Sequence, residues 1–154
     1  MGKTIVVILT FGLSILISYL LSLKHVKLHN FYLDFFTFNN CYENQLSYSK
    51  NTLPSIIENF NNRDSDFIEL LRRYMDNREV VNLSYLKDED YLLINEYVST
   101  LGKTDEYSQK QFIQNYKGII SKNLENSEVS KKRYCALYIK LGFFIGLTLV
   151  ILIL

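Results

Sequence analysis

The sequence predicts an all-α fold, an antiparallel helical bundle in the cytosol that is bracketed by an N-terminal and a C-terminal transmembrane helix. Two terminal stretches, residues 4–23 and 134–154, are apolar and contain a single charged residue, Lys140. The residues between them hold all 16 Asp and Glu of the chain, and their apolar residues recur at steps of three and four rather than alternating as in strands. We therefore divide the chain into an N-terminal anchor (1–23), a helical domain (24–133) and a C-terminal transmembrane helix (134–154).

The first apolar stretch, Thr4 to Leu23, has 20 residues without a charge, which is enough for a helix to cross the hydrocarbon core of a bilayer. A cleaved signal peptide has a shorter apolar core, followed by a cleavage site of small residues. This stretch is longer and is followed by "KHVKLHNF". We therefore expect an anchor that stays attached.

The last apolar stretch contains "KLGFFIGLTLVILIL", Lys140 to Leu154. The residues after Lys140 rise only about 21 Å as a helix, which is short of the roughly 30 Å hydrocarbon core. A spanning helix must therefore begin near Tyr134. The Lys140 ammonium can then extend along its flexible stem toward the headgroups.

Lysine and arginine gather at the ends of the two predicted spans that face the middle of the chain. Cytosolic flanks of transmembrane segments are enriched in these residues. The basic residues on this side are Lys24, Lys27, Lys131, Lys132, Arg133 and Lys140, whereas Lys3 lies on the other side. We therefore expect the helical domain in the cytosol and both termini outside.

The first span is expected to continue into the domain as one long helix that ends near Tyr48. Its apolar residues follow helical spacing: Leu28, Phe31, Tyr32, Phe35, Tyr42 and Leu46. A short second helix is expected with Asn51 as its N-cap and Pro54 in its first turn, where the missing amide would be unpaired anyway. This helix ends near Phe60.

Two further amphipathic helices are expected in the middle of the domain. Asp64 or Ser65 can cap the third helix, whose apolar stripe is Phe67, Leu70, Leu71 and Tyr74. The fourth helix has the stripe Leu83, Leu86, Leu93, Tyr97 and Leu101. We interpret "DEDY", Asp88 to Tyr91, as a helix start rather than a catalytic carboxylate pair, because no apolar pocket is visible that would raise a carboxyl pKa.

A turn at Gly102 is expected to separate the fourth helix from the fifth, because glycine suits the left-handed conformation just past a helix end. Thr104, Asp105 and Glu106 then start the fifth helix, with acids near its positive pole. Its stripe is Phe112, Ile113, Tyr116, Ile120 and Leu124. No strong helix breaker follows, so we expect this helix to continue into the last span.

The sequence contains no pattern typical of an active site, a metal site or a nucleic-acid-binding surface. His25 and His29 share a helix face, but no nearby acid completes a metal site, and we expect both to be solvated. Cys41 and Cys135 are too few and too far apart for a disulfide framework. The chain has a net charge of +1 and no basic stripe with interleaved aromatic residues. We expect no catalytic residue, no cofactor, no metal and no nucleic-acid partner.

Small residues on the two spans predict helix packing inside the membrane. Gly142 and Gly146 form a G-x-x-x-G motif, which lets another backbone approach closely. Ser14, Ser18 and Ser22 form a small, weakly polar stripe on the first span. This packing joins either the two spans to each other or this chain to a partner, which includes a second copy.

Three stretches make the chain resemble the stage III sporulation protein AB family of endospore-forming bacteria. "LGKTDEYSQ" matches the family pattern L-G-x-x-D-x-x-x-Q at Leu101, Gly102, Asp105 and Gln109. "KKRYCALYIKLGFFIGLTLVILIL" is similar to the basic cluster, Leu-Gly pair and glycine-spaced terminal span of the family.

The third stretch matches the family only in part, and one segment departs from it. "YENQLSYSKNTLP" is similar to the family's E-I-x-Y-G-x-T-P-L region at Tyr48 and Leu53. The stretch departs from this pattern at four positions. Gln45 stands in place of the acid, Ser49 in place of Gly, Asn51 in place of Thr and Thr52 in place of Pro. The segment from Met75 to Leu86 is shorter than in family members and lacks their Ala-Trp helix, since the chain has no Trp.

The resemblance implies a cytosolic helical domain similar to the platform protein of type II secretion and type IV pilus machines. It also implies membership of the channel complex between mother cell and forespore, in the mother-cell membrane that faces the forespore. A cytosolic secretion-type ATPase and other membrane subunits are the implied partners. From the residues alone, the alternative is a small pore-forming or holin-like protein, although neither span has the intramembrane charges or long polar face that line a water path.

Overall fold

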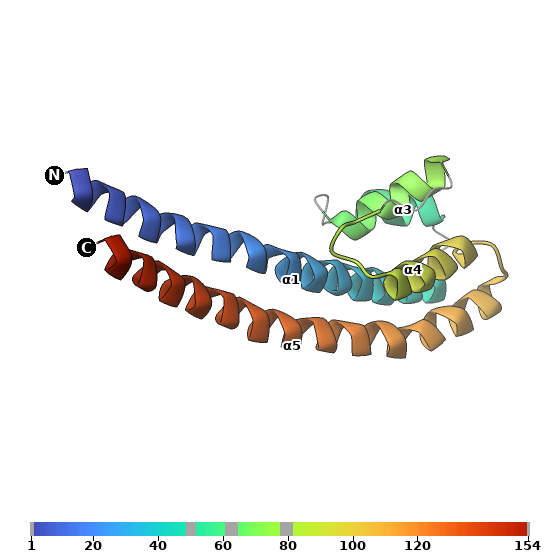
Figure 1. Ribbon diagram of the computed structural model, residues 1–154. Helices are drawn as coiled ribbons and strands as arrows, with labels where there is room; N and C mark the ends of the chain where they lie inside the picture. Colours follow the sequence, from blue (N-terminus) through green and yellow to red (C-terminus); the bar gives the residue numbers. More distant parts are fainter. Residues whose placement is uncertain (1, 49–51, 61–64, 78–81, 154) are drawn as a thin grey trace. The chain divides into compact units, whose positions relative to one another are not determined.

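The computed structural model describes residues 2–48, 52–60, 65–77 and 82–153. These residues form five α-helices: α1 (Gly2–Tyr48), α2 (Leu53–Asn59), α3 (Asp66–Asn77), α4 (Asp88–Thr100) and α5 (Glu106–Ile153) (Figure 1). The described residues contain no strand. The predicted all-α fold is therefore confirmed.

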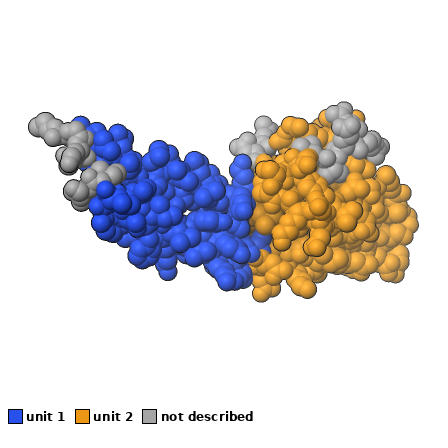
Figure 2. Space-filling model, viewed as in Figure 1, with its two compact units in different colours: residues 1–27, 127–154 blue, residues 28–126 orange. Residues whose placement is uncertain are grey.

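The chain forms two compact units, which are coloured separately in Figure 2. Unit 1 consists of Met1–Lys27 and Ser127–Leu154, and unit 2 consists of Leu28–Asn126. Both α1 and α5 therefore contribute residues to both units. The predicted segment boundaries after residues 23 and 133 concern the surface of the membrane, and they stay predictions.

The two helical segments of unit 1 pack antiparallel. The Ser14 hydroxyl donates to the Gly142 carbonyl at 3.2 Å, and the Cys135 thiol donates to the Ser22 carbonyl at 3.9 Å. Residue numbers in these contacts rise along α1 while they fall along α5. An antiparallel arrangement follows from this order.

Unit 1 exposes most of its apolar side chains. Leu9 is 65% exposed and Phe144 is 66% exposed, for example. Among the large apolar side chains that the structure describes as exposed, all but four belong to unit 1. Such a surface is unfavourable in water, and it is typical of helices that face lipid or a partner. In agreement with this, α1 and α5 are each long and apolar enough to cross a membrane.

Unit 2 is held together by a largely aromatic core. The Phe35 ring from α1 stacks on Phe67 from α3 with centroids 4.4 Å apart, and it meets Tyr97 from α4 edge-on at 4.6 Å. Each such pair contributes about 0.5–1.5 kcal/mol beyond the area it buries. The largest fully buried side chains come from all five helices: Phe31, Phe35, Phe38, Ile57, Phe67, Ile68, Leu70, Leu71, Ile94, Tyr97, Ile113 and Ile120.

Helices α2 and α3 begin near their predicted positions. The Ser65 hydroxyl accepts a backbone N–H of the first turn of α3 at 3.3 Å, so the predicted cap is confirmed at Ser65. The alternative cap, Asp64, lies outside the described residues. Helix α2 has Thr52 as its N-cap and Pro54 in its first turn. The cap is therefore one residue later than the predicted Asn51, which itself lies outside the described residues.

Helix α4 begins later than its apolar spacing predicts. The prediction that Leu83 and Leu86 belong to this helix is wrong, because α4 begins at Asp88. The physical reason is Asp90, whose carboxylate accepts the Lys87 backbone N–H at 2.9 Å and so caps the helix at this point. Leu86 is nevertheless buried in the core, at 8% exposed.

The two long helices run as the sequence predicts. α1 continues without a break from its apolar stretch to Tyr48, and α5 runs from Glu106 to Ile153. Within unit 2 they are again antiparallel, because Tyr32 contacts Asn123 while Asn39 contacts Ile113.

Candidate functional site

The residues that match the family pattern meet at the turn between α4 and α5, which we call the α4–α5 joint (Leu101–Gln109). Leu101 follows the last turn of α4, its backbone N–H donates to the Tyr97 carbonyl at 3.2 Å, and its side chain is only 5% exposed. Gly102 has a φ of 68°, in the left-handed region that glycine adopts without strain. The turn thus lies where the glycine predicts it.

Gln109 holds this turn from the start of α5. Its side chain is 1% exposed, and its Oε1 accepts the Gly102 backbone N–H and the Thr104 hydroxyl, both at 3.1 Å. Without this side chain the Gly102 N–H and the Thr104 hydroxyl would both lose this partner. The Gln109 Nε2 is also buried, and it has no hydrogen-bond partner among the described residues.

Asp105 caps α5 at the joint. Its Oδ1 accepts the Ser108 backbone N–H at 3.0 Å, and its carbonyl accepts the Gln109 N–H at 2.8 Å. The hydrogen bonds from Ser108 lower the pKa of the Asp105 carboxyl, and the charge lies at the positive end of the helix. The family residues of the joint therefore act together to fix how α5 follows α4.

A hollow of about 470 Å³ lies beside the joint within unit 2. The described residues that line it are mainly apolar, and Lys103 is the one charged side chain among them. They are Tyr42, Thr52, Leu53, Pro54, Ile57, Leu71, Tyr74, Met75, Val98, Leu101, Gly102 and Lys103. The joint thus borders an apolar surface that three other helices share.

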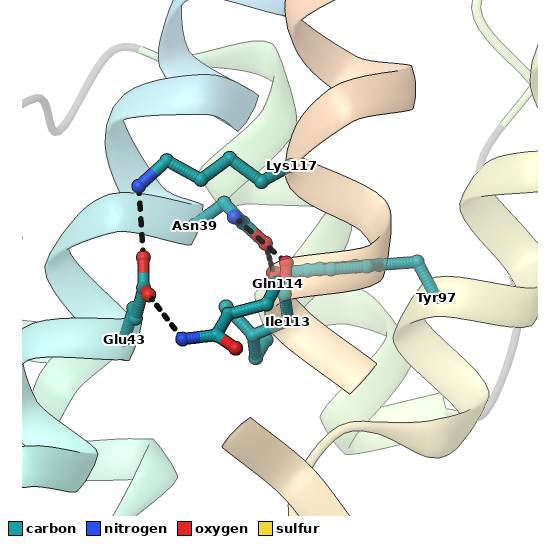
Figure 3. A network of polar contacts seen from close by, with 6 residues as sticks. All are labelled: Asn39, Glu43, Tyr97, Ile113, Gln114 and Lys117. Atoms are coloured by element: carbon teal, nitrogen blue, oxygen red, sulfur yellow. Dashed lines mark hydrogen bonds and ion pairs between the residues drawn. The ribbon is translucent and has the colours of Figure 1, made fainter. Parts of the chain in front are cut away.

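A polar network crosses the core of unit 2 between α1, α4 and α5 (Figure 3). Asn39 is fully buried, its Oδ1 accepts the Tyr97 hydroxyl at 2.9 Å, and its Nδ2 donates to the Ile113 carbonyl at 3.3 Å. Burial raises the pKa of Tyr97 well above its usual value, so its phenol stays a donor. Sequence reasoning missed Asn39, although an Asn between Phe38 and Tyr42 in an apolar stripe is the signal that would have found it.

A second polar contact ties α1 to α5 one turn further along (Figure 3). The Glu43 carboxylate accepts the Lys117 ammonium at 2.9 Å and the Gln114 amide at 3.1 Å. The hydrogen bond from Lys117, followed by that from Gln114, lowers the pKa of Glu43. Because the two charged side chains are 17% and 43% exposed, solvent screens the pair, and its net contribution stays at or below about 1 kcal/mol.

Two tyrosines anchor acidic residues at helix starts. The Tyr32 hydroxyl donates to Asp90 and the Tyr85 hydroxyl donates to Asp66. Burial first, and these hydrogen bonds second, raise the pKa of both phenols far above the usual value. Asp90 therefore caps α4 and also attaches it to α1, which agrees with the interpretation of "DEDY" as a helix start.

Small residues of α1 and α5 face each other in unit 1. Ser14 and Ser18 are 9% and 8% exposed, and the Ser14 hydroxyl bonds across the helix pair to Gly142. An added Cβ at Gly142 would come within 2.6 Å of the Ser18 Cβ, and one at Gly146 within 2.8 Å of the Phe11 ring. The structure thus places these residues against each other within one chain. Packing against a partner or a second copy stays a prediction.

The next turns of the same helix pair contain Ser22 and His25. Ser22 is 3% exposed and faces Cys135. The prediction that His25 is solvated holds only in part, because the side chain is half-buried. Its ring stacks on Tyr134 at 4.5 Å and lies 6.0 Å from Tyr138. Its Nε2 is buried and has no partner among the described residues.

The predicted boundary residues lie on both helices of unit 1. Lys24, Lys27, Lys132, Arg133 and Lys140 are exposed, and Lys131 is half-buried. Lys132 pairs with Glu128 at 2.6 Å, and the Arg133 guanidinium lies over the Tyr134 ring, 6.0 Å from its centroid.

The part of the chain that the structure describes contains no group of three or more His, Cys, Asp or Glu that could hold a metal ion. Cys41 and Cys135 are free thiols, and Cys41 packs against the core of unit 2. That the protein needs neither metal nor cofactor stays a prediction.

Comparison with known proteins identifies one relationship. No curated protein and no solved structure matches the chain significantly. A family model described as stage III sporulation protein AB matches residues 3–154 and so includes the α4–α5 joint, the basic boundary residues and both apolar stretches. The chain therefore belongs to the stage III sporulation protein AB family.

Proposed function

We propose that the chain is a non-enzymatic platform subunit of the secretion-like channel complex between mother cell and forespore. The observation that carries this proposal is the continuity of α1 and α5, each of which joins an apolar, membrane-length segment to the helical bundle of unit 2. A bundle that is attached to a membrane through two continuous helices suits a scaffold on which other subunits assemble. The family match supports the role in sporulation.

The proposal places unit 2 in the mother-cell cytosol and the apolar helices in the membrane that faces the forespore. The distribution of charge supports this orientation. Six of the seven basic residues of unit 1 lie at the ends of the two apolar stretches that face the middle of the chain, and the seventh, Lys3, lies on the other side.

A cytosolic secretion-type ATPase is the proposed partner of unit 2, and other membrane subunits are the proposed partners of unit 1. The exposed apolar side chains of unit 1 provide a surface for helix packing in lipid. In unit 2, the α4–α5 joint fixes the first turns of α5 through Gln109 and Gly102. ATPase binding should therefore depend on the geometry of this joint.

Affinity purification of the full-length chain from sporulating cells tests the proposal. The wild-type chain should retain the ATPase, and Gly102→Val should retain much less, because valine cannot adopt the backbone conformation at this position without strain. Gly118→Ala is the matched control, since this glycine is in α5 and an added Cβ there has no neighbour within 4 Å. Failure of the wild-type chain to recover any ATPase would contradict the platform role.

A further inference from the structure

The two units carry opposite charge. Unit 1 has seven Lys and Arg and one acidic residue, whereas unit 2 has ten Lys and Arg and fifteen Asp and Glu. The single acid of unit 1, Glu128, pairs with Lys132. For Lys24, Lys27, Lys131 and Arg133 the structure gives no ion pair with any described residue. Folding of unit 1 therefore leaves most of its positive charge uncompensated.

Five of these cations lie at one level of the helix pair, and we call them the basic band: Lys24, Lys27, Lys131, Lys132 and Arg133. The contacts of Ser22 with Cys135 and of His25 with Tyr134 place these turns of α1 and α5 beside each other. At 1.5 Å per residue, the five Cα atoms fall within about 10 Å along the helix axis. All except Lys131 are exposed.

Aromatic residues with polar groups adjoin the basic band. Tyr134 and Tyr138 flank the His25 ring, and Arg133 lies over the Tyr134 ring. Tyrosine concentrates where a transmembrane helix meets the headgroups, because its ring is apolar and its hydroxyl is polar. From Tyr138 onward the side chains of α5 are almost all apolar. The basic band therefore lies at the level of the lipid phosphates when unit 1 spans a bilayer.

We propose that the basic band is a binding surface for the phosphodiester headgroups of anionic phospholipids. Clusters of Lys and Arg next to a membrane span attract such headgroups, and a guanidinium can bind two phosphate oxygens at once. The apolar helices alone hold the chain in any bilayer, so they do not distinguish one headgroup from another. The basic band adds this preference. The inference is independent of the ATPase and of the channel complex.

Lipid binding to the full-length chain in non-ionic detergent tests this proposal. Short-chain phosphatidylglycerol or short-chain phosphatidylcholine is added, and the lipid molecules that remain bound are counted by mass spectrometry of the intact complex. The wild-type chain should retain phosphatidylglycerol in preference to phosphatidylcholine, and retention should fall as salt is raised. Equal retention of the two lipids would overturn the proposal.

Two matched sets of substitutions separate the basic band from general charge effects. The band variant combines Lys24→Gln, Lys27→Gln, Lys131→Gln and Arg133→Gln, which leaves the pair between Lys132 and Glu128 intact. The control combines Lys87→Gln, Lys103→Gln, Lys110→Gln and Lys122→Gln in unit 2, which also comprises three exposed side chains and one half-buried side chain. The band variant should bind phosphatidylglycerol about tenfold more weakly or worse, and the control should bind it like the wild type.

Arginine substitutions and competitors complete the test. With Lys24→Arg, Lys27→Arg and Lys131→Arg the charge is kept, so phosphatidylglycerol binding should be kept as well. Inorganic phosphate and a short single-stranded oligonucleotide should compete weakly, because neither has acyl chains that contact the apolar helices beside the basic band. Undiminished lipid binding by the band variant, or displacement by phosphate or the oligonucleotide at the concentration of the lipid, would overturn the assignment.

Discussion

Asn39 introduces an amide into an aromatic core, and the cost of burying that amide depends on its two hydrogen bonds. Both partners, the Tyr97 hydroxyl and the Ile113 carbonyl, are supplied by other helices of unit 2. A buried amide without partners costs on the order of 1–3 kcal/mol by mutational measures. Asn39 therefore specifies how α1, α4 and α5 pack, because other arrangements of these helices would leave it unpaired.

Tyr97→Phe should lower the free energy of unfolding by about 1–3 kcal/mol, because it leaves the buried Asn39 Oδ1 without the Tyr97 donor. Chemical denaturation of the full-length chain in detergent, followed by circular dichroism, measures the change. Tyr107→Phe on the exposed face of α5 is the control, and it should stay within about 0.5 kcal/mol of the wild type. An unchanged unfolding midpoint for Tyr97→Phe would show that the network contributes nothing.

Gly102→Val should lower the free energy of unfolding by about 1–3 kcal/mol, because a φ of 68° is strained for a β-branched residue. Space is not the limit here, since an added Cβ would meet the Leu53 side chain at an ordinary 3.4 Å. Gly102→Asn separates the two causes, because asparagine tolerates the left-handed conformation and should cost less than half as much. Equal melting temperatures for the wild type and Gly102→Val would rule out a strained turn.

The glycine of the joint could be predicted from the sequence, whereas its partner could not. Gly102 follows an apolar stripe and precedes Asp105, so the local order of residue types is enough to indicate the turn. The hydrogen bond from the Gly102 N–H to Gln109 requires a side chain seven residues away to fold back onto the turn. Family resemblance marked Gln109 as important, but only the structure shows what it does.

At the level of elements, the long helices were predictable and the short connections were less so. α1 and α5 have many consecutive apolar turns and no internal breaker, so their extent follows from periodicity. The predicted start of α4 is wrong because Leu83 and Leu86 continue the helical spacing of the apolar residues. Where the helix begins depends instead on a single cap from Asp90. An isolated side-chain hydrogen bond of this kind does not appear in an apolar pattern.

Gly146→Leu, and more strongly Gly142→Leu, should separate the two helices of unit 1. The added side chains would overlap Phe11 and Ser18, and the helix backbones must move apart to admit them. Cross-linking of Cys135 to a cysteine introduced by Ser22→Cys, in a chain that also has Cys41→Ala, measures the separation in the membrane. The yield of the intramolecular cross-link should fall.

Gly12→Leu is the matched control for this cross-linking experiment. It adds the same side chain to α1, but an added Cβ at Gly12 has no neighbour within 4 Å. The cross-link should then form as in the wild type. If Gly142→Leu also cross-links like the wild type, the two helices do not pack through their glycine and serine faces.

At the level of the whole molecule, the sequence predicts the apolar ends and a helical middle, with boundaries after residues 23 and 133 that concern the membrane surface and stay predictions. The packed units of the structure are divided at other positions, after residues 27 and 126. The difference arises because apolar composition ends at the first charge, whereas helix packing in unit 1 continues for another turn or two through the stack of His25 on Tyr134. Composition therefore indicates where lipid can surround the chain, and it does not indicate where one packed unit ends.

The charge difference between the units predicts their orientation across the membrane. The net positive charge of unit 1 lies mostly in the basic band, and such charge is retained on the cytosolic side during insertion. Unit 2 should therefore be cytosolic, and position 2 should be outside. Single cysteines introduced by Asn115→Cys or Gly2→Cys, with Cys41→Ala and Cys135→Ala, report the two sides when intact cells are treated with a membrane-impermeant maleimide.

The choice of labelled residue decides whether this experiment can discriminate. Ser65 is 3% exposed and caps α3, so a cysteine there would escape the reagent in either orientation. Asn115 is exposed on α5 within unit 2, and its side chain can react wherever the reagent is present. In intact cells Gly2→Cys should be labelled and Asn115→Cys should not, whereas after lysis both should be labelled. Labelling of Asn115→Cys in intact cells would show that the orientation is the reverse of the predicted one. Unit 2 would then be out of reach of any cytosolic ATPase, because unit 2 and the ATPase would lie on opposite sides of the membrane.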